Sequence, residues 1–501
     1  MPAGAPNSFR ERALFEGCPA SLPPGPGKRD AIVKIVWSVN GGRYDASPLS
    51  PADRWGTAMS QAPTATSFEA AFSEESLAQI WNQIKSSKTD LLTHRVKIPR
   101  GWDGVGVREF ERQRDQHLRA IQRKAIAGRY TFRPFLFHMQ PKADGGERKI
   151  AYSGIRDRIV QAALHTVLAP AVDAQLTDSA YAYREGRGAH DAIRDLFVAA
   201  TGGRPYFVKS DFVQFFDRLD HTRLEKLLAE LPVDTRARQL AWRFARTGDL
   251  DRNAAVRSTP SGRTIGVPQG GVVSGVLANL YLADFDRAVR LIPDATLIRY
   301  ADDFVVLCPD EAICAAVFEC VQTAARDAHL DLHAGAKTVP CGHVNDGLNF
   351  VGFRLRGTRV MIKPGNVAKF QRRVDAVLAR HESKLRDGAY SSADECIQQA
   401  VYHLNRKVTG LEIDGHQRSW MTFFHIVNDV AQIRRLDRWI WRRLADLCQR
   451  VRTSHRKRSE MIALGYRGLH REYWKVRRRL RARALPYSGF LPRSSADQRD
   501  D

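Results

Sequence analysis

The sequence contains no uninterrupted run of eighteen apolar residues, so it predicts no transmembrane helix. Residues 1–26 also lack the apolar stretch of a secretory signal peptide. Only seven of the 501 residues are cysteine, none in a Cys-x-x-Cys pair, and the spacing of Cys308, Cys314 and Cys320 matches no zinc-ligand pattern. We therefore expect a cytoplasmic chain with reduced, inert thiols and no membrane partner.

Acidic residues are few relative to basic ones. The chain has 55 Asp and Glu against 78 Lys and Arg, which gives a formal net charge of +23 and a pI near 10.0. Such an excess favours a polyanionic partner, either nucleic acid or an anionic membrane surface. The hydrophobic fraction of 43% is typical of a globular protein, and the chain is long enough for several packed units.

The basic excess is concentrated towards the C-terminus. Residues 434–493 contain 19 Lys or Arg and 4 Asp or Glu, a net charge of +15. A run of charge is usually the solvated face of a helix. At this density, with Trp439 and Trp441 interleaved, contact with an RNA or hybrid backbone is better supported. The residues that we assign to nucleic-acid binding are Arg434, Arg435, Arg438, Arg442 and Arg443.

Hydrophobic periodicity divides the chain into elements. Residues 1–70 are rich in Pro, Gly, Ser and Ala and predict a poorly ordered extension with one short strand at 32–37. We expect strands at 130–139 and from 206 to Asp211, and none after residue 365. Helices are expected at 68–84, 107–127, 156–168, 219–231, 235–246, 311–328, 367–386, 393–407 and 419–450. Two more are expected, one after residue 193 that ends near 200 and one after the loop at 266–275 that ends near 292. Gly128 is the expected C-cap of the helix at 107–127, and the helix at 156–168 is expected to end before Pro170.

An acidic pair lies between two apolar half-runs. Tyr300-Ala301-Asp302-Asp303 follows Leu297-Ile298 and precedes Phe304-Val305-Val306-Leu307, and these residues favour two strands joined by a tight turn. Adjacent carboxylates repel each other unless a cation neutralises them, which suggests a divalent metal with oxygen ligands. A bare Asp-Asp pair is more often a solvated turn, so the assignment depends on the rest of the chain.

Two further stretches bear on this choice. Tyr206-Phe207-Val208 predicts a strand that enters from the Gly202-Gly203 turn and ends at Asp211. A glycine-rich loop, residues 266–275, then leads into an apolar helix. A lone Asp on a strand, a glycine-rich loop with a helix, and an Asp-Asp hairpin, in this order, resemble the palm of reverse transcriptases. The likeness is closest to the bacterial group II intron type.

The resemblance extends over residues 75–450. Gly145-Gly146-Glu147-Arg148-Lys149-Ile150 and residues 155–161 resemble the fingers of that family, residues 179–193 resemble the segment before the palm strand, and Asn349-Phe350-Val351-Gly352-Phe353 resembles the primer-grip hairpin. Six motifs in family order are a specific signal. The resemblance implies an α+β right-hand polymerase with antiparallel sheets. Its parts would be fingers and palm at 71–365, a helical maturase-like thumb at 366–455 and a basic C-terminal segment at 456–501.

The resemblance also implies the chemistry and the residues that carry it. Asp211, Asp302 and Asp303 would be catalytic and would bind two Mg²⁺ ions together with the backbone carbonyl of Phe212, Asp303 being the weaker ligand. The reaction would add dNTPs to the 3′-hydroxyl of a nucleic-acid primer on an RNA template. Nucleotide contacts are implied for Lys142, Arg148, Phe216, Gln269, Gly270 and Lys337.

Each nucleotide contact has an ordinary alternative. Phe216 would exclude a ribose 2′-hydroxyl, unless it is only a core phenylalanine. Lys142 and Arg148 would reach the triphosphate, unless the basic hairpin is merely solvated. The loop at 268–270 would form the floor of the nucleotide site, where glycine permits close approach of the backbone. Lys337 would donate a proton to the leaving pyrophosphate, and a plain surface lysine is an equal alternative.

Departures from the family leave the biological role open. Gly275 follows the loop serine where proline is usual, and Ala182, Tyr183 and Glu185 stand where the family typically has Gly, Phe and Pro. No His/Cys-rich endonuclease pattern follows the thumb. Two alternatives therefore stand beside an intron-type polymerase: a domesticated antiphage-defence reverse transcriptase that copies a dedicated structured RNA, and an RNA-binding maturase acting mainly in splicing. Phe216 disfavours an RNA-dependent RNA polymerase, and no particular oligomeric state is predicted.

Overall fold

The computed structural model describes residues 66–88, 96, 98–141, 147–251, 261–408, 411–413, 416–418, 420–452 and 458–482, all within one compact unit, Arg54–Asp501. The extension predicted at 1–70 lies outside these residues apart from its last five positions, and so do the strand at 32–37 and Lys142. Among the described helices, none is long and apolar enough to cross a bilayer.

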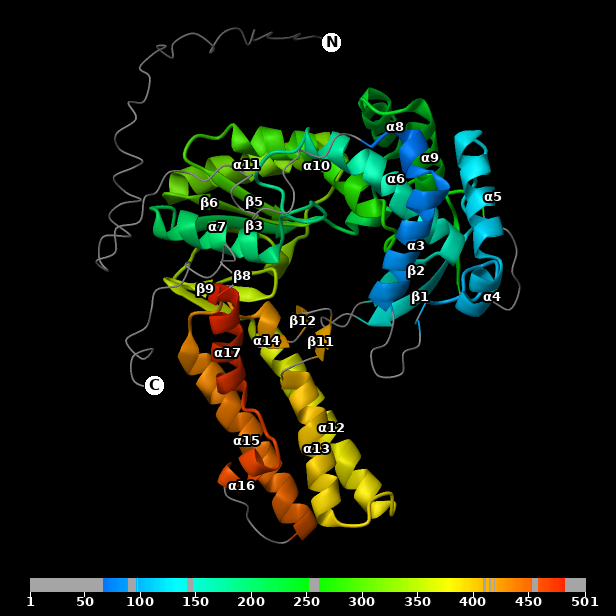
Figure 1. Ribbon diagram of the computed structural model, residues 1–501. Coiled ribbons are helices and arrows are strands. Elements are labelled where there is room, and N and C mark those ends of the chain that lie inside the picture. Colours follow the sequence, from blue (N-terminus) through cyan, green and yellow to red (C-terminus); the bar gives the residue numbers. More distant parts are fainter. Residues whose placement is uncertain are drawn as a thin grey trace, which may run out of the picture. The chain divides into compact units, whose positions relative to one another are not determined.

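A four-stranded antiparallel sheet is the central element. Helices α10 (Ser274–Arg290) and α11 (Glu311–Asp327) cover one face and α7 (Ala189–Thr201) covers the other (Figure 1). Because both faces are buried, the strands read as nearly continuous apolar runs instead of alternating ones. In spatial order the strands are β5 (Thr296–Tyr300), β6 (Asp303–Cys308), β3 (Tyr206–Asp211) and β7 (Val339–His343).

A second sheet lies in the N-terminal half. Its central strand β1 (Phe135–Pro141) pairs antiparallel with β2 (Glu147–Tyr152) and parallel with β4 (Asp249–Asp251). The strand predicted at 130–139 begins only at Phe135, whose N–H makes the first bond, to the Gly248 carbonyl at 3.0 Å. Pro134 before it has no N–H to add to the ladder. The helices of this half are α2 (Phe68–Ala71), α3 (Glu74–Lys88), α4 (Val107–Arg112), α5 (Arg114–Ile126), α6 (Ile155–Asp173), α8 (His221–Glu230) and α9 (Thr235–Ala245).

Three helix predictions in this half were wrong in detail. The helix expected at 68–84 is divided at Phe72, where φ is −101°, into α2 and α3. The helix expected at 107–127 is divided at Gln113, where φ is −121°, into α4 and α5. Gly128 does follow the second helix in the left-handed conformation of a C-cap, with φ +63°. Helix α6 continues past Pro170 to Asp173, because a proline removes only its own N–H bond and Val172 in the last turn stays buried.

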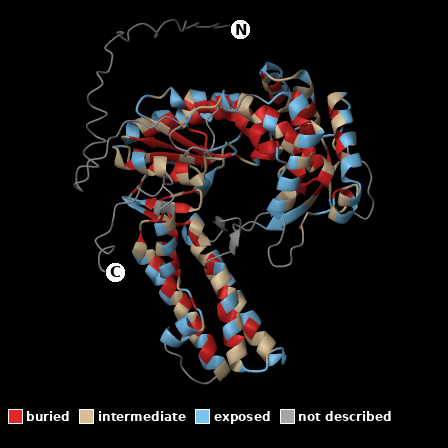
Figure 2. Cartoon of the chain, viewed as in Figure 1, coloured by how far each residue is buried: buried red, intermediate tan, exposed pale blue. Residues whose placement is uncertain are grey.

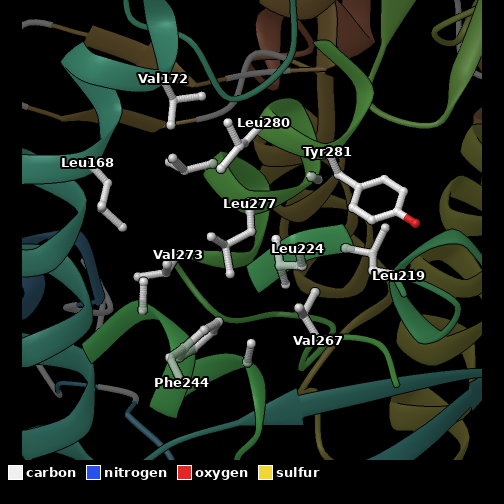
Figure 3. Close-up of a cluster of buried hydrophobic side chains, with 14 of the residues drawn as sticks. Leu168, Val172, Leu219, Leu224, Phe244, Val267, Val273, Leu277, Leu280 and Tyr281 are labelled. Atoms are coloured by element: carbon white, nitrogen blue, oxygen red, sulfur yellow. The ribbon is translucent and has the colours of Figure 1, made fainter. Parts of the chain in front are cut away.

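The apolar face of α10, which follows the glycine-rich loop, packs against helices α6 and α9 of the N-terminal half. Figure 3 shows the cluster, in which Val273, Leu277 and Leu280 approach Leu168 of α6 and Phe244 of α9. Figure 2 shows that such buried positions continue along the core of the sheet and its covering helices. The start of α10 is therefore fixed by packing, which matters because the loop before it carries predicted nucleotide contacts.

The C-terminal part is mainly helical and shares a second core with the outer face of the central sheet. A three-stranded sheet, β10-β9-β8, precedes it, with a tight turn at Val351 and Gly352 where the primer-grip hairpin was expected. The strands are β8 (Leu348–Phe350), β9 (Phe353–Arg356) and β10 (Arg359–Ile362), and the helices are α12 (Pro364–Arg386), α13 (Ala393–Val408), α14 (Trp420–Phe423), α15 (Val430–Arg452), α16 (Arg458–Ala463) and α17 (Leu469–Ala482).

Two predictions for this region were wrong. Strands do occur after residue 365, because β11 (Leu411–Ile413) and β12 (His416–Arg418) form an antiparallel hairpin. The helix expected at 419–450 is broken between α14 and α15. At the break, the N–H of Asn428 bonds to the Val360 carbonyl at 3.0 Å, and the Asp429 carboxylate accepts from the N–H of Gln432 at 3.0 Å. A side chain that caps the new helix in this way starts α15 afresh.

Three cysteines come together: Cys308 and Cys314, six residues apart, and the more distant Cys341. Cys308 and Cys314 are buried and Cys341 is exposed. Hydrogen bonding to Cys308 and burial raise the pKa of the Cys314 thiol far above its usual value, and burial raises the pKa of Cys341 to about 11. A raised pKa keeps a thiol protonated and unreactive. The inert thiols expected from the sequence agree with this arrangement.

Candidate active site

Three carboxylates meet where strands of the central sheet end. Asp211 is the last residue of β3 and Asp303 is the first of β6, and the two are directly paired in the antiparallel register. Asp302 stands in the two-residue turn between β5 and β6, whose ladder closes with the pair Tyr300 and Asp303. The hairpin predicted from the sequence is thus present, and strand pairing brings the distant Asp211 beside it.

The turn is held in an unusual conformation by a buried ion pair. Ala301 has φ +59°, in the left-handed region that costs a residue with a side chain about 1 kcal/mol or more. Its carbonyl accepts from a guanidinium N–H of Arg299 at 3.0 Å. Arg299 is 1% exposed and also donates to both carboxylate oxygens of Asp286 on α10, at 2.7 and 2.6 Å. The turn that carries Asp302 is therefore anchored to α10, which covers the sheet.

Two of the three carboxylates, Asp302 and Asp303, have raised pKa values. Burial raises the pKa of Asp302, the charge of Asp211 raises it further, and Arg148 and His333 act in the opposite direction. Burial likewise raises the pKa of Asp303, while its ion pair with Lys209 opposes the shift. Because burial and mutual repulsion both disfavour the charged forms, a bound cation would relieve the site.

The donor atoms fit a hard cation at Asp211 and Asp302. Oδ1 of Asp211 is buried and has no hydrogen-bond partner among the described residues. Its Oδ2 lies 3.9 Å from Nε2 of His333 and 3.8 Å from Nζ of Lys337. No group of three or more His, Cys, Asp or Glu side chains in the described part of the chain forms a metal-binding cluster. The carboxylate of Asp303, which Lys209 engages, is the one least available as a ligand.

Predicted nucleotide contacts surround these carboxylates. Arg148 on β2 is near enough to lower the pKa of Asp302. Phe216 lies in a short 3-10 turn, Phe215–Asp217, and is 9% exposed. Phe212 follows Asp211 with its ring buried, so its backbone and not its side chain is what it offers the site. The loop lysine Lys337 reaches Asp211 from another short turn, Gly335–Lys337.

The glycine-rich loop is bonded to the edge strand of the second sheet. The Gln269 carbonyl accepts from the N–H of Ala151 at 2.8 Å. Gly270 has φ +115°, and a Cβ there would lie 2.5 Å from the Ala151 carbonyl oxygen, so only glycine fits. The hydroxyl of Ser274 donates to the Pro268 carbonyl at 2.6 Å. These bonds give the loop a single, rigid position.

The five arginines assigned to nucleic-acid binding lie on α15 but differ in their surroundings. Arg434, Arg435, Arg438 and Arg442 are exposed, on the side away from the buried Ile433, Leu436, Ile440 and Leu444. Arg443 is half-buried and donates to Asp375 of α12 at 2.7 Å. The first four present charge to solvent, whereas Arg443 ties two helices together.

Several residues at the site were not singled out by the sequence analysis. Lys209 lies two positions before Asp211, and this spacing places both side chains on one face of β3. That spacing was a usable signal. In the sequence, Tyr183 stands out only as a departure from the family's usual residue. His333 and Arg299 carried no signal, because His333 reaches the site through its N–H bond to the Asp211 carbonyl and Arg299 through its contact with α10.

Comparison with known proteins gives a family match over the region that carries the three carboxylates. Residues 140–355 match the family described as "Reverse transcriptase (RNA-dependent DNA polymerase)". Protein YkfC of Escherichia coli (strain K12) is 28% identical over 295 residues, which cover 51% of this chain and 75% of that protein. The group II intron-encoded protein LtrA of Lactococcus lactis subsp. cremoris is 30% identical over 142 residues, 28% of this chain and only 23% of LtrA.

A solved structure is also similar at low identity. The apo telomerase from Candida tropicalis aligns with a TM-score of 0.39 and 13% identity, covering 73% of this chain and 68% of that one. A TM-score below 0.5 is weak, so the α+β assignment here rests on the observed sheets and the family match. The antiparallel sheets and covering helices agree with the fold predicted from the sequence.

Proposed function

We propose that this chain is an RNA-directed DNA polymerase that adds dNTPs to a primer 3′-hydroxyl on an RNA template. The match of residues 140–355 to the reverse transcriptase family and the similarity to a group II intron-encoded protein support the proposal. The observation that carries the proposal is the convergence of Asp211, Asp302 and Asp303 on paired strand ends inside the matched region. The unpartnered, buried Oδ1 of Asp211 and the raised pKa values of Asp302 and Asp303 support this interpretation over a solvated turn, the ordinary alternative.

The chain's own residues would hold and balance the reacting charges. When bound, two Mg²⁺ ions would activate the primer hydroxyl and stabilise charge on the leaving pyrophosphate. Asp211 and Asp302 would be the principal ligands, with the carbonyl of Phe212 beside them. Asp303 would contribute less, because Lys209 engages its carboxylate. Lys337, 3.8 Å from Asp211, is placed to donate a proton to the pyrophosphate.

The nucleotide would bind between the carboxylates and the glycine-rich loop. Arg148 supplies a guanidinium to the triphosphate, since it already acts electrostatically on Asp302. Gln269 and Gly270 form the floor, held by their contacts with Ala151. The Phe216 ring would stand against the 2′ position of the sugar, which favours dNTPs over rNTPs.

Primer extension tests the proposal. We expect the full chain with Mg²⁺ and a primed RNA template to make DNA from dNTPs, and Asp302→Asn to lower the rate roughly a hundredfold or more, as loss of a preorganised charge-stabilising group typically does. The matched control is Asp294→Asn in the turn before β5. Asp294 is exposed and 3.9 Å from Arg204, and its φ of +60° suits asparagine.

The outcomes separate the candidate functions. Full activity in Asp302→Asn would contradict the assigned ligand set. Absence of DNA product from the wild type on every template, together with salt-sensitive RNA binding, would favour the maturase alternative. The share of LtrA that this chain covers is small, so an intron or defence role is tested separately, by sequencing the RNA that copurifies with the full chain.

A further inference from the structure

Tyr183 is a large aromatic residue that stays half-exposed beside the candidate nucleotide site, with 49% of its surface accessible. Its ring centroid lies 6.5 Å from that of Phe216, and the planes cross at 81°, an edge-to-face arrangement. The charge of Asp302 and the nearby Tyr300 add to burial in raising the pKa of its phenol. The ring thus contacts Phe216 and is near enough to Asp302 for its charge to act on the phenol.

The backbone around Tyr183 is held in place from two directions. Its own φ is +59°, a left-handed conformation that bulky side chains disfavour. The preceding Ala182 carbonyl accepts from the buried amide of Asn279 on α10 at 2.8 Å. The N–H of Tyr181 donates to the Arg299 carbonyl on β5 at 3.0 Å. A disfavoured conformation that its surroundings enforce is often part of a functional site.

Gly275 provides the space for this ring. A Cβ at Gly275 would lie 2.5 Å from both Cδ1 and Cγ of Tyr183, a distance at which one group must move. Gly275 is in the first turn of α10, where glycine is otherwise a poor helix former. The ring of Tyr183 and the missing side chain of Gly275 therefore form a matched pair.

We propose that Tyr183 is a specificity-determining residue, whose ring packs against Phe216 and holds it where a ribose 2′-hydroxyl would clash, and that Gly275 makes room for it. The inference rests on the proposed polymerase function. Tyr183 acts through Phe216: it positions the ring that would exclude a ribose 2′-hydroxyl and does not itself touch the reacting atoms. The edge-to-face contact, and not the phenol hydroxyl, is the interaction that matters.

Competition between dNTPs and rNTPs in primer extension tests the inference. We expect Tyr183→Ala to reduce the preference for dNTPs by about tenfold, the upper end for one aromatic contact, mainly through a lower KM for rNTPs. Tyr183→Phe keeps the ring and should stay within about twofold of wild type. The kcat for dNTPs should change little in either variant, whereas general damage to the fold would lower it.

The variant Gly275→Ala tests the same inference independently. It should displace the Tyr183 ring and reproduce the loss of selectivity. The double variant Gly275→Ala/Tyr183→Ala should be no worse than Tyr183→Ala, because the clash disappears with the ring. Matched controls are Tyr402→Ala, an exposed tyrosine of α13, and Gly365→Ala, where a Cβ meets no atom within 4 Å.

The outcomes distinguish this inference from the function on which it rests. An active Tyr183→Ala variant with a wild-type unfolding midpoint and an unchanged dNTP-to-rNTP ratio overturns the role of Tyr183 alone. Additive losses in the double variant overturn the pairing with Gly275. A wild-type protein that incorporates neither nucleotide overturns the polymerase assignment and this inference with it.

Discussion

Asp157 shows how a single buried carboxyl makes the stability of this fold depend on pH. It is 1% exposed and accepts a hydrogen bond from the Tyr130 hydroxyl at 2.7 Å. Burial raises the pKa of Asp157 to about 6, although the bond to Tyr130 acts in the opposite direction. The uncharged acid is therefore the form that suits the folded state.

The sign of the effect follows from the raised pKa. Below about pH 4 the carboxyl is protonated in both states, and the contribution to stability is fully present. It is lost as the pH rises towards 6, because only the unfolded chain then ionises freely. We expect the free energy of unfolding of the wild type to fall by about 2 kcal/mol between pH 4 and pH 6 on account of Asp157.

Urea unfolding of Asp157→Asn between pH 4 and 7 measures this contribution. Asparagine keeps an acceptor for Tyr130 but does not titrate, so the variant should lack that part of the fall. A pH dependence identical to the wild type would show that another group is responsible. His425 is not a substitute explanation, because burial lowers its pKa to about 4 and its contribution is lost in the opposite direction, as the pH falls.

At the scale of elements, the ion pair between Arg299 and Asp286 joins β5 to α10. Both side chains are almost completely buried, and Arg299 also bonds to Asn279 at 3.0 Å and to the Ala301 carbonyl. Removing one partner leaves a buried charge unpaired, which typically costs about 3–5 kcal/mol. We expect Arg299→Met to destabilise the fold by this amount in urea unfolding.

A double variant separates stability from catalysis. Arg299→Met/Asp286→Leu removes both charges and should recover much of the lost stability, because a buried ion pair is often replaceable by apolar groups. Polymerase activity should not recover, because the Ala301 carbonyl still lacks its donor and the carboxylate turn is no longer held. Equal recovery of stability and activity would mean that the ion pair supports only the fold.

At the scale of the whole molecule, the exposed arginines of α15 are the proposed nucleic-acid surface outside the carboxylate site. Arg434, Arg438 and Arg442 recur every four residues and so share one face of the helix. We expect the triple substitution to Gln to weaken RNA binding and to reduce the slope of log K against log salt by about 2, given roughly 0.7 per single-strand phosphate contact.

The control for this prediction lies on the same helix. Arg450→Gln removes a charge whose guanidinium already makes two bonds of 3.1 Å to Glu382, so its effect on the salt slope should be small. Filter binding over a range of NaCl concentrations provides the slopes. An unchanged slope in the triple variant would place the nucleic-acid contacts elsewhere on the chain.

Prediction from the sequence was most accurate where a local pattern and the tertiary environment agree. The hairpin at Asp302 and Asp303 was predictable because its strands are buried on both faces and their apolar runs are unmistakable. Prediction failed where the effect of one residue on a helix boundary depended on its tertiary contacts. Pro170 does not end α6, and Asp429 starts a new helix inside an apparently continuous one. The hairpin of β11 and β12 has strands too short to produce a periodic signal.

The sequence by itself determined the reverse transcriptase resemblance, the order of the motifs and the identity of the three carboxylates, because motif residues and apolar periodicity are local properties. Only the tertiary structure decided which side chains contact the carboxylates and the segments around them. Pairing of β3 with β6 placed Lys209 against Asp303, and packing on α10 placed Tyr183 over Gly275 and Arg299 under Ala301. Such contacts join residues far apart in the chain, and no local pattern encodes them.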